Sequence, residues 1–249
     1  MPAADQRCMQ AIRIVAFLLL AALGGCLEME QTITIEANGG GKQVVKMAMR
    51  ETTLTDIARA SAAAEIGTAP NPKAVFDKEL VGRELVAAGL ALTEHKAKLD
   101  AGKRSVDLTA TFADFATLQK SPLCGSTAEW TLTKGPQAGT AKLTLYPQGR
   151  QAWGDARAKA ETMQKDVDAV AADFFRKKQA QLTGLDLTLR FKVPGNVLVW
   201  TANMEKTGDQ EVTARITAEQ IKTPAELVRR LAPRFEVVFD AKDCKLPLN

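Results

Sequence analysis

Residues 31–49 of the chain read QTITIEANGGGKQVVKMAM. From Gln31 to Glu36 polar and apolar side chains alternate, which is typical of a strand with one buried face. Asn38 and the three glycines after it predict a tight turn, and residues 42–49 return to an extended pattern. Because so short a connection joins only antiparallel neighbours, this stretch predicts a β-hairpin.

Strands of the same kind are expected along the rest of the chain. They are residues 90–99, 104–112, 128–134, 140–146, 185–193, 197–203, 211–217 and 235–240. The first four make two more hairpins, and residues 185–217 are expected to form a three-strand meander. The predicted class is therefore α+β, with antiparallel sheets built from hairpins and helices packed on one face.

Helical segments separate these strands. Asn71 and Pro72 are typical of a helix start, and the helix that they begin is expected to end at Gly89. One long helix is predicted at about 152–182 from its 3.6-residue apolar period. Thr223 opens a capping box with proline at the first helical position, which predicts a last helix.

The composition is that of a globular chain. Of 249 residues 46% are apolar and 25% charged, and the net charge is +4, which excludes intrinsic disorder. No apolar run approaches twenty residues, which excludes a polytopic membrane protein. Since no stretch has the composition of a linker, residues 26–249 are expected to form a single domain. The alternative is two packed halves that meet near residues 147–184.

The first 26 residues have the layout of an export signal. Arg7 and Arg13 precede an apolar run over residues 14–23, which is too short to span a membrane. The end of the run, Leu23-Gly24-Gly25-Cys26, resembles the lipobox of bacterial lipoproteins. A plain secretory signal with a coincidental cysteine is the alternative interpretation.

The lipobox resemblance implies removal of residues 1–25 as a signal peptide. Cleavage would fall between Gly25 and Cys26, and a diacylglycerol would be attached to the sulfur of Cys26. Two or more acyl chains anchor a protein stably where a single chain does not. The resemblance therefore implies an exported protein that is lipid-anchored to the cell membrane or the outer membrane and faces the periplasm or exterior.

Two cysteines remain in the processed chain once Cys8 is removed and Cys26 is acylated. They are Cys124 and Cys244, and in an oxidising compartment they could close a disulfide between a mid-chain loop and the C-terminal tail. Two separate thiols are the alternative. A zinc site is disfavoured, because neither cysteine has a histidine or another cysteine nearby in the sequence.

Three segments of the body resemble the LppM-type domain of bacterial lipoproteins. They are QTITIEANGGGKQVV at 31–45, SVDLTATFADFATL at 105–118 and LRFKVPGNVLVWTAN at 189–203. The resemblance implies an exported α+β domain tethered at a membrane, with lipid or lipoglycan ligands proposed for some members. It implies no catalytic residue.

Motifs for catalysis are missing from the sequence. His95 is the single histidine and stands beside Lys96 on a predicted strand, which favours a surface position. The glycines at 39–41 precede Lys42, but neither Ser nor Thr follows, so a hairpin turn is favoured over a phosphate-binding loop. No catalytic, cofactor-binding or metal-ligating residue is expected, and the chain is not predicted to be an enzyme.

Cationic residues gather at two places. They are Lys96, Lys98, Lys103 and Arg104 at the second predicted hairpin, and Arg176, Lys177 and Lys178 near the end of the long helix. Nucleic acid is excluded as a partner by export and by the low aromatic content. Anionic lipid headgroups suit these clusters better, although scattered solubilising charge is the simpler interpretation.

Two functional hypotheses follow. The first is a non-catalytic binding module, in which a curved sheet and the long helix enclose an apolar or lipid-like ligand. The alternative is a structural or assembly lipoprotein that docks other envelope proteins. An enzyme that uses carboxylates comes third.

Overall fold

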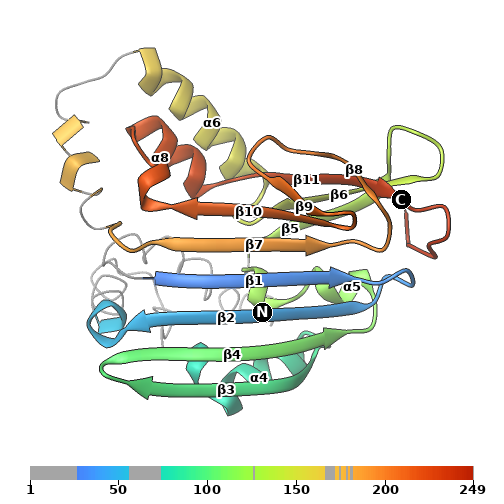
Figure 1. Ribbon diagram of the computed structural model, residues 1–249, viewed down its shortest axis with the longest axis horizontal. Coiled ribbons are helices and arrows are strands. Elements are labelled where there is room, and N and C mark those ends of the chain that lie inside the picture. Colours follow the sequence, from blue (N-terminus) through green and yellow to red (C-terminus); the bar gives the residue numbers. More distant parts are fainter. Residues whose placement is uncertain are drawn as a thin grey trace, which may run out of the picture.

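The computed structural model describes residues 27–55, 74–125, 127–165, 172–173, 175–177, 179 and 182–248. Two sheets form its framework (Figure 1). The larger has seven strands in the order β3-β4-β2-β1-β7-β10-β9, and the smaller has four in the order β5-β6-β11-β8. The α+β class is therefore confirmed, with mostly antiparallel sheets.

The first predicted hairpin is confirmed as β1 (Leu27–Ile35) and β2 (Gly41–Arg50), which pair antiparallel. Gly41 has a φ of 158°, and a Cβ there would lie 1.9 Å from the carbonyl oxygen of Thr34. Only glycine therefore permits this close approach of the two strands. The second hairpin is confirmed as β3 (Ala91–Asp100) and β4 (Lys103–Phe112), and β4 joins the free side of β2.

The pairing of β1 with β7 (Asp186–Lys192) departs from the expected pattern. The two strands run parallel, with Glu28 opposite Asp186 and Thr34 opposite Lys192. Parallel neighbours need a long connection, and here the whole middle of the chain supplies it. β10 (Glu211–Thr217) and β9 (Glu205–Gly208) then complete the seven-stranded sheet.

The predicted three-strand meander over 185–217 is not formed. β8 (Val197–Trp200) leaves the larger sheet and pairs with β11 (Phe235–Asp240) instead. β11 also pairs with β6 (Thr140–Tyr146), which forms the third predicted hairpin with β5 (Glu129–Lys134). The chain thus changes sheets at the Pro194-Gly195 turn, which the sequence alone places within one sheet.

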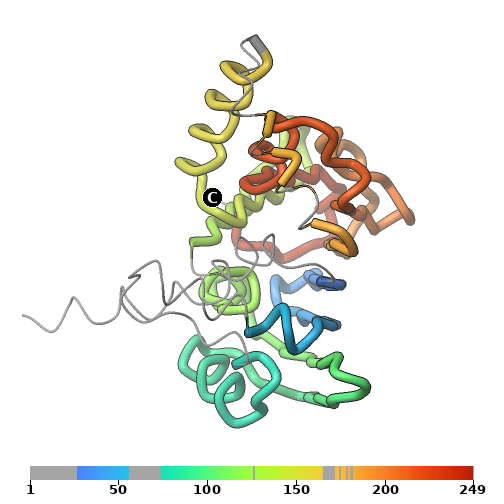
Figure 2. The backbone as a smooth tube through the Cα atoms, turned by 90° about the vertical axis from the view of Figure 1, so that its left-hand side faces the viewer, coloured from blue at the N-terminus to red at the C-terminus, as the bar shows by residue number. Residues whose placement is uncertain are grey.

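The helices pack at different places in the molecule. Those with described bounds are η2 (Ala74–Phe76), α4 (Lys78–Ala87), α5 (Phe115–Leu118), η3 (Pro122–Cys124), α6 (Arg150–Lys165), η4 (Ala218–Gln220) and α8 (Pro224–Leu231). α4 contacts β3 and α5 contacts β4, whereas α6 and α8 pack against each other. Figure 2, a view along the strands, shows α4 at the bottom of the molecule and α6 at the top. A common face for all helices is therefore not confirmed.

The predicted start of one helix differs from the observed start, and the predicted extent of another stays a prediction. α4 begins after Asp77, whose carboxylate accepts from the backbone N–H of Glu79 and Leu80, both at 3.0 Å. The expected cap at Asn71 lies outside the described residues. α6 is described as far as Lys165, and residues 166–171 are not described, so one helix over 152–182 stays a prediction.

A shared core joins the two sheets. Inward side chains of β1 and β7 meet those of β5 and β11 in one cluster of buried residues. Phe191 of β7 stands between Trp130 of β5 and Phe235 of β11, with ring centroids 6.0 and 6.2 Å apart. On β1, β5 and β7 the outward side chains are polar, which is the alternation that the sequence predicts.

Candidate functional site

A pocket of about 600 Å³ opens between α6, α8 and the loop that follows β8. Figure 1 shows α6 and α8 side by side above the smaller sheet. The volume lies within the range of small-molecule sites, roughly 300–1,000 Å³. α6, the described part of the predicted long helix, forms one wall of this pocket.

Trp153 of α6 forms the aromatic part of the lining. Its ring meets the ring of Tyr146 edge-on, with centroids 5.6 Å apart. The guanidinium groups of Arg157 and Arg234 stand over the indole, 5.9 and 5.2 Å from its centroid. Cations over an indole face are held by the quadrupole of the ring, so Trp153 fixes the positions of both arginines.

Local sequence places these groups. Gly149 has a φ of 84° and turns the chain from β6 into α6, whose first N–H, that of Arg150, donates to the Glu129 carboxylate at 3.0 Å. The predicted capping box of α8 is confirmed at Thr223 and Glu226. These two helix starts fix which side chains of α6 and α8 line the pocket.

Positive charge exceeds negative charge in the lining, which has four arginines and two glutamates. Glu161 pairs with Arg157 at 3.1 Å. The carboxylate of Glu226 accepts from the backbone N–H of Lys222 at 2.7 Å and of Thr223 at 3.0 Å. Both carboxylates are therefore already engaged.

The other three arginines of the lining are Arg229, Arg230 and Arg234. Arg229 donates to the amide oxygen of Gln164 at 3.0 Å. Within the described part of the chain, none of the three lies within 4.0 Å of a carboxylate oxygen. The pocket thus holds cations whose charge the described carboxylates do not neutralise.

The cationic clusters that the sequence singles out are different. Five of the six described members pair with nearby carboxylates: Lys96 with Glu94, Lys103 with Glu28, Arg104 with Glu51, and both Arg176 and Lys177 with Asp173. Lys98 has no such pair among the described residues. Lys178 lies outside the described residues. The arginines of the pocket were not predicted, although the segment VRRLAPR at 228–234 concentrates three of them.

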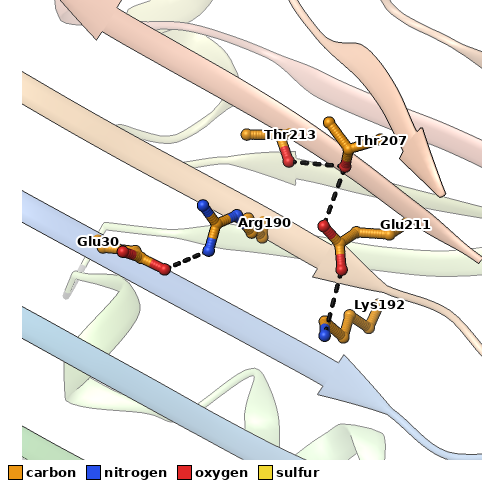
Figure 3. A network of polar contacts seen from close by, with 6 residues as sticks. All are labelled: Glu30, Arg190, Lys192, Thr207, Glu211 and Thr213. Atoms are coloured by element: carbon orange, nitrogen blue, oxygen red, sulfur yellow. Dashed lines mark hydrogen bonds and ion pairs between the residues drawn. The ribbon is translucent and has the colours of Figure 1, made fainter.

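The outer face of the larger sheet also carries paired charges. Figure 3 shows Arg190 of β7 beside Glu30 of β1. It also shows Glu211, whose carboxylate contacts Lys192 at 3.2 Å and Thr207 at 3.0 Å. Cross-strand pairs of opposite charge stabilise a sheet. Because these charges satisfy one another, the face fits a structural role better than a binding role.

The predicted disulfide between Cys124 and Cys244 is not formed, since both are free thiols. The Cys124 thiol is buried and accepts from the side-chain amide of Gln43 at 2.8 Å. The hydroxyl of Ser121 in turn donates to the amide oxygen of Gln43. Burial raises the pKa of the Cys124 thiol to about 12, against smaller opposite effects of its hydrogen bonds. This polar environment, which the spacing of the cysteines does not reveal, replaces the disulfide.

The remaining predictions concern the lipobox, His95, a metal site and a membrane-spanning helix. Gly25 and Cys26 lie outside the described residues, so the lipobox is not tested. His95 is half-buried on the edge strand β3, and its Nε2 lies 3.0 Å from the carbonyl oxygen of Val75. In the described ranges, no three His, Cys, Asp or Glu side chains gather to hold a metal ion. None of the described helices is long and apolar enough to cross a membrane.

Comparisons with known proteins leave the family open. No protein-family model matches the chain, and no curated protein matches it. Among solved structures, the chain is similar to the folded domain of LppM from Mycobacterium tuberculosis, determined by NMR. The two are 12% identical over 87% of this chain and 91% of that domain, with a TM-score of 0.43.

Proposed function

We propose that the chain is a non-catalytic binding module whose ligand is an anionic amphiphile. The observation that carries this proposal is the lining of the pocket between α6 and α8. It combines the Trp153 indole with three arginines that have no carboxylate partner among the described residues. An apolar group would contact Trp153, and an acidic group would meet Arg229, Arg230 and Arg234. Guanidinium groups suit phosphate and carboxylate because they donate in a planar fork.

Export and lipid anchoring at Cys26 belong to the same proposal. A binding module for amphiphiles works where such molecules are found, at a membrane. Cys26→Ala is expected to block acylation and leave an uncleaved precursor, which intact-mass spectrometry detects. Normal cleavage between residues 25 and 26 in this variant would contradict the anchor and leave the pocket proposal untouched.

The ligand hypothesis is tested with two single-chain lipids that differ in charge. The purified full chain is titrated with lysophosphatidylglycerol and with lysophosphatidylcholine below their micelle concentrations, by calorimetry. The anionic lipid is expected to bind more tightly. Arg234→Gln and Arg229→Gln are each expected to weaken its binding about tenfold, the effect of one lost charge-assisted hydrogen bond.

The matched control is Arg83→Gln, which removes one exposed arginine from α4, away from the pocket. Its affinity for lysophosphatidylglycerol is expected to equal that of the wild type. Equal affinity for both lipids, or an equal loss in the Arg83 and Arg234 variants, would overturn the proposed ligand chemistry.

A further inference from the structure

β8 is an edge strand with a run of exposed apolar side chains. Leu198 is 45% exposed, Val199 57% and Trp200 37%. The strand ends the smaller sheet, as Figure 1 shows. Three neighbouring apolar residues left open to solvent on one strand are unusual, because isolated exposed residues are the norm.

The other edge strands differ from β8 in charge. Their exposed charged residues include Glu94 and Lys96 on β3, Glu129 and Lys134 on β5, and Glu205 and Lys206 on β9. Charged side chains on an edge strand disfavour association with strands of other molecules. β8 has the sequence VLVW and carries none. Its apolar edge therefore has the composition of a contact surface.

The edge continues directly into the arginine pocket. The loop Thr201–Asn203 follows Trp200 and lines the pocket together with Arg229, Arg230 and Arg234. Asn203 holds this arrangement, since its side-chain amide donates to the carbonyl oxygen of Arg234 at 3.1 Å. An apolar edge and a group of cations without carboxylate partners thus lie next to each other.

We propose that β8 and the mouth of the pocket dock onto an anionic lipid bilayer. Leu198, Val199 and Trp200 enter the interfacial region, and the arginines lie at the level of the headgroups. Tryptophan favours this interface because its ring is apolar and its N–H is polar. Cations near such a surface are attracted by the negative lipids. The proposed ligand then enters the pocket from the membrane, a role that rests on the proposed function, whereas the docking does not.

The backbone edge of β8 is not fully open to a partner strand, whether from another protein or from a second copy. A partner strand needs the outer backbone groups of β8, but Val197 already uses both of its own. Its N–H donates to the carbonyl oxygen of Asp209 at 2.7 Å, and its carbonyl accepts from the Lys206 ammonium at 3.1 Å. Successive side chains of the strand point to opposite faces, which suits insertion of the edge into a fluid surface.

The test uses the full chain reconstituted into vesicles of phosphatidylcholine and phosphatidylglycerol that carry brominated acyl chains. Bromine quenches tryptophan fluorescence only on contact, so quenching reports entry into the bilayer whether or not the chain is anchored. Trp130 is buried in the core, but Trp153 lines the pocket and would be quenched by lipid that enters it. All chains in the quenching test therefore carry Trp153→Phe, so that Trp200 is expected to give most of the signal. Trp200→Phe is therefore expected to lower the quenching at least about twofold. Leu198→Ser is expected to lower it through weaker docking.

The matched control is Leu99→Ser on the charged edge strand β3, where Leu99 is 54% exposed. Quenching in this variant is expected to equal that of the wild type. Equal quenching in the Trp200→Phe and wild-type chains overturns the proposal. A second outcome also overturns it. If the chain self-associates without vesicles and this protects Trp200 from quenching by aqueous acrylamide, the edge of β8 binds a second copy.

The two proposals fail separately. If brominated lipid does not quench the wild-type chain, docking is refuted. The pocket proposal stands in that case if the Trp200→Phe chain still binds lysophosphatidylglycerol normally. Quenching that depends on Trp200 in a chain that binds neither lysolipid refutes the pocket ligand and keeps the docking.

Discussion

The Cys124 thiol is stabilised by an amide and not by a second sulfur. Its side chain is buried and accepts a hydrogen bond from Gln43, while Cys244 is only partly covered. We therefore expect Cys244 to react with maleimide in the native chain and Cys124 to react only after unfolding. Peptide mass mapping distinguishes these residues from Cys8 and Cys26. Protection of both thiols until a reductant is added would contradict the free thiols.

The raised pKa of Cys124 predicts a loss of stability in alkali. Its thiol has a pKa of about 12 in the folded chain against an ordinary value of 9.0, so between these values the folded state holds a proton that the unfolded state has lost. The stabilisation is complete below pH 9 and falls as the pH rises towards 12, by up to about 1.4 kcal/mol per pH unit.

Cys124→Ala tests this pH dependence. The variant is expected to show a shallower decline than the wild type when the free energy of unfolding is measured in urea from pH 8 to 11. Other titrating groups are common to both chains, so they cancel in the difference between the two slopes. Parallel slopes would exclude Cys124 as the titrating group.

The pocket shows why site residues were hard to predict at the residue scale. Arg229, Arg230 and Arg234 stand close together in the sequence, yet a group of cations in a sequence does not reveal which of them find carboxylates. Lys103 and Arg104 form a similar group and are paired with Glu28 and Glu51. Only the packing of α6 against α8 shows that the three arginines, unlike Lys103 and Arg104, have no carboxylate partner among the described residues.

At the scale of elements, Gly195 fixes the crossing from one sheet to the other. A Cβ at this position would lie 1.8 Å from the backbone carbonyl oxygen of Asp240, which cannot move aside as a flexible side chain could. Gly195→Ala is therefore expected to lower the free energy of unfolding by about 1–3 kcal/mol. Chemical denaturation measures the effect.

Gly154 provides the matched substitution. It lies inside α6, and a Cβ there would meet nothing within 4 Å. Alanine favours a helix over glycine, so Gly154→Ala is expected to raise the free energy of unfolding by about 0.5–1 kcal/mol. A similar result for both glycines would refute the close approach of the Gly195 turn to β11.

Local pairing explains which elements the sequence predicted. The hairpins of β1 with β2 and of β3 with β4 join neighbours through short turns, so alternation and turn residues are sufficient to predict them. The parallel pairing of β1 with β7 joins strands from distant parts of the chain. No local pattern encodes such a contact, and for the same reason the departure of β8 from its expected meander was not predicted.

At the scale of the whole molecule, the core joins the two sheets through Phe191. This side chain belongs to the larger sheet, is 1% exposed, and lies between Trp130 and Phe235 of the smaller sheet. A single domain was expected from the sequence, with two packed halves as the alternative. The shared aromatic contacts favour cooperative unfolding of both sheets, because neither can lose its partner without exposing this core.

Phe191→Ala is expected to lower the free energy of unfolding by about 3–5 kcal/mol, and Phe191→Leu by about 1–2 kcal/mol. Hydrogen exchange measured by mass spectrometry follows β1 of one sheet and β6 of the other separately. If the sheets unfold together, protection falls by the same factor in both strands of each variant, because their slowest amides exchange through the same global opening. Loss of protection in β1 alone, with β6 unchanged, would instead show two halves that unfold independently.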